Sequence, residues 1–131
     1  MAGLSTEQSA ELLLTHKEEV ARAVTAALYD ARPELLERYG ESGRAKCLQD
    51  MRYNVEHLVP ALALQRPDLF AGYITWVDGL LRARNVPTED LRLSLRFLEQ
   101  EAMRVWPAEL KSILAECLNA SLAALDQAPA P

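Results

Sequence analysis

Apolar residues recur at spacings of three and four along nearly the whole chain, which is the period of an amphipathic α-helix. Glycine is scarce, runs of β-branched residues are absent, and leucine, alanine, glutamate and arginine dominate, all of which favour helices. Prolines, glycines and short polar turns divide the apolar stripes from one another. The pattern therefore predicts an all-α fold of about six helices with short connections, packed as a globin-like or similar bundle.

Cap and turn signals give the expected bounds of these helices. A first helix is expected over residues 6–30, opened by a capping box of Ser5 and Gln8. Pro33 opens a short helix that Gly40 ends. Four longer helices are expected after it, over residues 42–65, 68–83, 89–105 and 107–126.

The sequence also predicts a kink at one proline, an N-cap after another, and the bounds of the domain. Pro60 lies inside the predicted helix 42–65 and should kink it, because its ring removes a backbone donor and crowds the preceding turn. Thr88 is the predicted N-cap of the helix that follows the turn around Pro87. We expect one domain over residues 1–125, and a flexible tail or the start of a linker over 126–131.

Composition and charge narrow the classes of function. The 131 residues carry a net charge of −5, which argues against binding to nucleic acid because phosphates require a basic surface. No apolar run approaches 18 residues, so no membrane span is expected, and the acidic N-terminus lacks a signal-peptide pattern. Cys47 and Cys117 are too few for a disulfide framework. We expect a cytoplasmic protein with free thiols.

Candidate chemistry is concentrated on the predicted helix 42–65. Its core stripe consists of Leu48, Met51, Val55, Leu58, Val59 and Leu62. Beside this stripe, Cys47, Asp50, Asn54 and Ala61 follow one another at spacings of three, four and seven, so they stack along one line, with His57 on the same strip. A thiol, a carboxylate and an amide with a small residue beyond them could form the floor of a groove for a long ligand.

The residues alone leave other interpretations open. Cys47 can be a small buried hydrophobe and Asp50 a solvated charge, in a helical interaction or regulatory domain that binds no ligand. A metal site of Cys47, Asp50 and His57 is poorly spaced, because ten residues of helix separate the cysteine from the histidine by roughly 15 Å. Haem bound by His16 or His57 is a third possibility in a globin-like sensor.

The segment "KCLQDMRYNVEHLV" resembles the chromophore helix of the phycobiliproteins, above all of allophycocyanin-like chains. That helix typically reads Cys-Leu-Arg-Asp-Met-x-Tyr-Tyr. A second segment, "GLLRARNVPTEDL", is similar to the turn that ends in Gly-Thr-Pro in that family. The resemblance covers roughly residues 15–105 and extends to small red-fluorescent proteins engineered from the family. It also extends to compact domains of bacterial light sensors that carry a cobalamin-binding domain. The residues that match the chromophore helix in place are Cys47, Leu48, Asp50, Met51 and Tyr53.

The resemblance implies a pocket for a linear tetrapyrrole. It implies that Cys47 forms a thioether with the pigment and that Asp50 accepts hydrogen bonds from the pyrrole N–H groups. The arginine that binds a propionate in the family is Gln49 here, its second tyrosine is Asn54, and its turn glycine is Asn85, which can still adopt a left-handed conformation. Other basic residues must then bind the propionates, with aromatic and polar side chains around the rings. The further candidate chromophore-binding residues are Arg44, Lys46, Met51, Arg52, Tyr53, Asn54, His57, Tyr73 and Trp76.

The expected function is therefore that of a chromoprotein without enzymatic activity, either a light sensor or a fluorescent module. Biliverdin is the expected bilin. We also expect a homodimer, because the helix over residues 68–83 has more apolar surface than a small domain can bury. A fused or associated cobalamin-binding or output domain is a possible partner. The apolar residues behind the dimer prediction are Phe70, Tyr73, Trp76, Val77 and Leu80.

Overall fold

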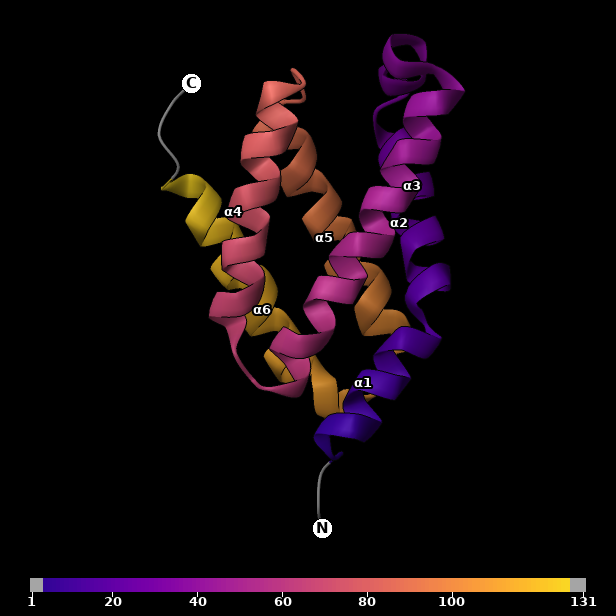
Figure 1. Cartoon of the computed structure of the whole chain (residues 1–131). Coiled ribbons are helices and arrows are strands. Elements are labelled where there is room, and N and C mark those ends of the chain that lie inside the picture. The colour runs from indigo at the N-terminus through magenta and orange to yellow at the C-terminus, as the bar shows by residue number, and fades with distance from the viewer. Residues whose placement is uncertain (1–3, 128–131) are drawn as a thin grey trace.

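Six α-helices account for almost all of residues 4–127, the part of the chain that the computed structural model describes (Figure 1). The predicted all-α fold of about six helices is confirmed. Their bounds are α1 Thr6–Thr15, α2 Lys17–Ala31, α3 Glu34–Ala63, α4 Pro67–Ala83, α5 Thr88–Val105 and α6 Ala108–Asp126.

The N-terminal part of the chain forms two helices instead of the single predicted helix 6–30. The capping box is confirmed, since the Gln8 N–H donates to Ser5 Oγ at 3.0 Å and the Ser5 N–H donates to Gln8 Oε1 at 2.9 Å. The prediction of one helix is wrong because the chain leaves the helical path at His16, with φ −96° and ψ 3°. The bend allows α1 to pack on α3 while α2 packs on both α3 and α5.

Helix α3 is interrupted at Gly40, as predicted. Gly40 adopts φ 70° and ψ −173°, which separates a short first segment from the long second one. A residue with a Cβ rarely adopts such a positive φ, so glycine suits this position. Pro60 keeps helical dihedral angles, so the helix continues through it to Ala63.

The turn between α4 and α5 differs from the prediction in one respect. Pro87 occupies the N-cap position of α5, and Thr88 is the first helical residue. The Thr88 hydroxyl does not cap the helix and instead donates to Asp78 Oδ1 at 2.7 Å. Asp78 is 1% exposed, and Thr88 satisfies its Oδ1 while Arg82 donates to its Oδ2 at 3.1 Å. Asn85 adopts φ 62°, so the left-handed conformation expected of it is confirmed.

The main core is one cluster to which all six helices contribute buried apolar side chains. Helices α4 and α6 lie side by side, and α3 contacts α1, α2, α4 and α6 (Figure 1). The predicted stripe on α3 is largely buried, and Cys117 of α6 is fully buried in the same core. The largest fully buried side chains include Leu13, Leu58, Leu62, Phe70, Ile74, Leu95, Leu98, Leu114 and Leu118. This packing leaves the Cys47–Asp50 edge of α3 facing the space between α2, α4 and α5.

The C-terminal helix α6 ends at Asp126, whose carboxylate pairs with Arg92 of α5. The predicted tail 126–131 lies outside the described residues from residue 128 onward. None of the helices within the described range is both long and apolar enough to span a membrane.

Candidate functional site

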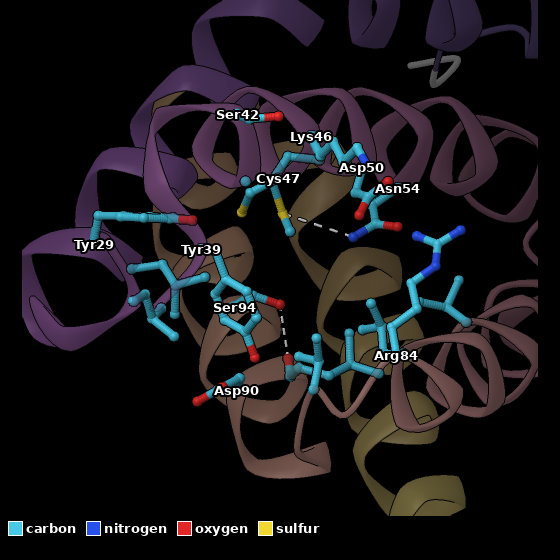
Figure 2. Close-up of a pocket in the computed structure, with 18 residues that line it drawn as sticks. Tyr29, Tyr39, Ser42, Lys46, Cys47, Asp50, Asn54, Arg84, Asp90 and Ser94 are labelled. Atoms are coloured by element: carbon cyan, nitrogen blue, oxygen red, sulfur yellow. Dashed lines mark hydrogen bonds between the residues drawn. The ribbon is translucent and has the colours of Figure 1, made fainter. Parts of the chain in front are cut away.

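A cavity of about 420 Å³ opens between α2, α3, α4 and α5 (Figure 2). Its volume is within the range of roughly 300–1,000 Å³ that is usual for small-molecule sites. Most of the lining is apolar, and the polar groups are concentrated on a few side chains. Helix α3 contributes Lys46, Cys47, Asp50, Met51 and Asn54, and the other walls include Leu28, Tyr29, Val77, Leu81, Arg84, Asp90, Leu91 and Ser94.

The Cys47 thiol is half-buried at the cavity wall. Burial, together with the negative charge of Asp50 one helical turn away, raises the pKa of this thiol to about 11. The thiol is therefore almost entirely protonated at neutral pH. Because the thiolate is the reactive form, Cys47 lacks the activation of a catalytic cysteine.

Asp50 presents a carboxylate to the same cavity. Burial raises the pKa of Asp50, while the positive charges of Arg84 and Lys46 oppose this shift through space. Figure 2 shows the Arg84 guanidinium turned toward the Asp50 and Asn54 side chains. The carboxylate is partly desolvated, so a ligand that donates hydrogen bonds to it would stabilise its charged form.

A group of aromatic side chains lies behind Asn54, outside the cavity lining. Asn54 is 2% exposed, and its Oδ1 accepts a hydrogen bond from the Tyr73 hydroxyl at 2.9 Å. The His57 ring stacks on Tyr73 with centroids 3.8 Å apart and planes 6° apart. Trp76 lies next to Tyr73, with centroids 6.1 Å apart, and is 61% exposed. Tyr73 thus holds Asn54 by a hydrogen bond, and His57 and Trp76 pack on Tyr73, all three outside the cavity lining.

The remaining predicted site residues on α3 also lie outside the lining. Arg52 donates to both carboxylate oxygens of Glu18, at 2.7 and 2.9 Å. The Arg44 guanidinium lies over the Tyr29 ring, 5.4 Å from its centroid. Tyr53 is 47% exposed. Arg52 is thus paired with a residue of α2. Of the predicted site residues, the cavity lining brings together five, namely Lys46, Cys47, Asp50, Met51 and Asn54.

Several lining residues were absent from the sequence prediction. Arg84 follows α4, and Asp90 and Ser94 lie on α5. Tyr29 and Tyr39 also line the cavity, and Tyr29 packs with Leu35 in a second, smaller core cluster. Arg84 and Asp90 lie within the segment "GLLRARNVPTEDL", which carries part of the resemblance, and this was the one available signal.

The metal and haem interpretations gain no support from the geometry. Over residues 4–127, no cluster of three or more His, Cys, Asp or Glu side chains is arranged to hold a metal ion. His16 lies at the junction of α1 and α2, 3.6 Å from Glu19, and neither His16 nor His57 lines the cavity. No protein family, curated protein or solved structure was found to match this chain.

Proposed function

We propose that the chain binds biliverdin or another linear tetrapyrrole in the cavity, with the pigment attached to Cys47. Its role is that of a light-sensing or fluorescent module and not that of an enzyme. One observation carries this proposal: a thiol and a half-buried carboxylate, one helical turn apart on α3, face the same mainly apolar cavity.

The polar groups of the cavity suit the parts of such a ligand. Asp50 can accept hydrogen bonds from pyrrole N–H groups, which favours a protonated tetrapyrrole. Attachment requires the Cys47 thiol to add across a vinyl group of the pigment. The S–H bond breaks, an S–C bond forms, and the proton ends on the other vinyl carbon, so no oxidant is required.

Two cationic side chains at the cavity suit the acidic groups of the ligand. Lys46 lies on α3 and Arg84 directly follows α4, and both act on Asp50 through space. Arg52, by contrast, is occupied by Glu18, and Arg44 lies on Tyr29. Lys46 and Arg84 are therefore the best-placed partners for the propionates, and an arginine can bind a carboxylate through two parallel hydrogen bonds.

A second function remains a candidate because of a different observation. Tyr53, Trp76 and Leu80 are 47%, 61% and 38% exposed on α3 and α4. Exposed aromatic and aliphatic side chains together favour an interaction surface, and the protonated Cys47 thiol is also compatible with a domain that binds no ligand. A homodimer and an attached cobalamin-binding or output domain are part of our proposal in either case. A cytoplasmic location stays a prediction.

The two functions are separated by mixing the purified chain with biliverdin and recording the absorbance spectrum. We expect a sharpened red band that survives acid–urea denaturation. Cys47→Ser should lose the denaturation-resistant band and its zinc-induced fluorescence. Cys117→Ser is the matched control, because Cys117 is fully buried in α6 away from the cavity. A spectrum identical to that of free biliverdin would favour the interaction domain.

A further inference from the structure

Asp90 of α5 lines the cavity on the side opposite the strip on α3 (Figure 2). The residue is 4% exposed. Its Oδ1 accepts a hydrogen bond from Arg32 Nη1, whereas its buried Oδ2 has no partner within residues 4–127. A buried acceptor of this kind is costly unless a ligand or a water molecule satisfies it.

The local sequence explains why this oxygen has no partner. Asp90 is the third residue of α5, where an acidic side chain usually accepts a hydrogen bond from the N-cap backbone N–H. Here the N-cap residue is Pro87, which has no N–H to donate. The neighbouring Ser94 hydroxyl is also unavailable, because it donates to the Leu91 carbonyl at 2.8 Å. Asp90, a lining residue of the cavity, thus keeps one buried acceptor oxygen that no donor within residues 4–127 satisfies.

We propose that Asp90 Oδ2 is a second ligand-binding group, which accepts a hydrogen bond from a neutral N–H donor of the bound molecule. Arg32 already balances the charge of Asp90, so the free oxygen favours a neutral donor over a second cation. In a linear tetrapyrrole whose inner N–H groups face Asp50, that donor is the lactam N–H of an end ring. This inference rests on the proposed function and extends it to the orientation of the ligand between α3 and α5.

The test compares biliverdin with its O-methyl lactim ether, in which an end-ring nitrogen has lost its hydrogen. Binding is measured by absorbance titration in the full chain carrying Cys47→Ser, so that it is reversible. We expect this parent chain to bind biliverdin about tenfold more tightly than the ether, as is typical of a hydrogen bond to a charged group. Asp90→Asn should remove this preference, because the amide oxygen keeps the hydrogen bond from Arg32 and the amide NH2, a donor, then takes the place of Oδ2.

Asp78→Asn is the matched control. Asp78 is also a buried, arginine-paired aspartate, but it does not line the cavity, so its substitution should leave the preference intact. Circular dichroism monitors folding, and Asp90→Ser replaces Asp90→Asn if that variant loses helicity. Equal affinities of the parent chain for the two ligands would overturn the inference and assign Oδ2 to water. A preference that persists in the Asp90 variant would overturn it too, by showing that the added methyl group causes the difference. Failure of the parent chain to bind biliverdin at all would contradict the proposed function itself.

Discussion

Asp50 is the residue whose chemistry separates the two candidate functions most sharply. If it accepts hydrogen bonds from the pyrrole nitrogens, Asp50→Asn retains the shape but removes the negative charge that stabilises a protonated pigment. The pKa of the bound chromophore should then fall. The red band should weaken at neutral pH and recover on mild acidification, while Cys47 still attaches the pigment. Superimposable absorbance titrations of the two proteins would remove Asp50 from the site.

The same substitution has a separate effect on the chain without ligand. Burial raises the pKa of Asp50, so the folded chain binds this proton more tightly than the unfolded chain does. Asp50 therefore contributes stability at low pH, below the ordinary pKa of the carboxyl group, and loses it as the pH rises through the folded-state value. The melting temperature of Asp50→Asn should exceed that of the wild type by more at pH 7 than at pH 4. Asp30→Asn, at an exposed position, controls for the loss of one charge, and a difference independent of pH would contradict the prediction.

At the scale of elements, helix periodicity and turn residues predicted most of the helix bounds. Gly40 and Asn85 both adopt positive φ, and each is a residue type that tolerates it. The break at His16 could not be predicted, because no glycine or proline marks it and the cause is the different packing of α1 and α2. Thr88 was misassigned for a similar reason, since its partner Asp78 lies on another helix.

The backbone after α3 is strained at Gln65, and this strain can be tested by substitution. Gln65 adopts φ 54°, and the following Arg66 N–H donates to the Ala61 carbonyl at 2.8 Å, which is the Schellman arrangement. Glycine adopts this conformation without the clash of a Cβ. Gln65→Gly should therefore stabilise the chain by about 0.5–1 kcal/mol, measured by urea unfolding. The same substitution at the exposed, helical Gln100 of α5 should destabilise it by about the same amount. Destabilisation at both positions would show that the left-handed turn is not strained.

At the scale of the whole molecule, the cavity wall formed by α3 could be predicted from the sequence, but the opposite wall could not. The periodicity of a single helix placed Cys47, Asp50 and Asn54 on one line, and all three line the cavity. The opposite wall depends on where α4 and α5 pack, which no local pattern determines. Arg84 and Asp90 were therefore missed, although they contribute charges that face the ligand space.

Only some of the apolar residues behind the homodimer prediction are exposed to solvent and can contribute to an interface. Of the five apolar residues of α4 behind that prediction, Phe70 is fully buried, and Tyr73 and Val77 are half-buried. Trp76 and Leu80 remain exposed, and Tyr53 of α3 is exposed as well. A surface used by two copies should be centred on Trp76, since exposed tryptophans are often the residues that contribute most to interfaces.

The dimer prediction can be tested by sedimentation of the full chain at micromolar concentration. We expect a dimer for the wild type, because pairing of two such surfaces removes exposed apolar area from water. Trp76→Arg should give a monomer with unchanged helicity, because it places a charge at the centre of the contact. Leu14→Arg is the matched control: Leu14 is a large apolar side chain of α1, 47% exposed and outside this surface. A wild-type monomer would contradict the prediction, and dissociation of both variants would place the contact elsewhere on the molecule.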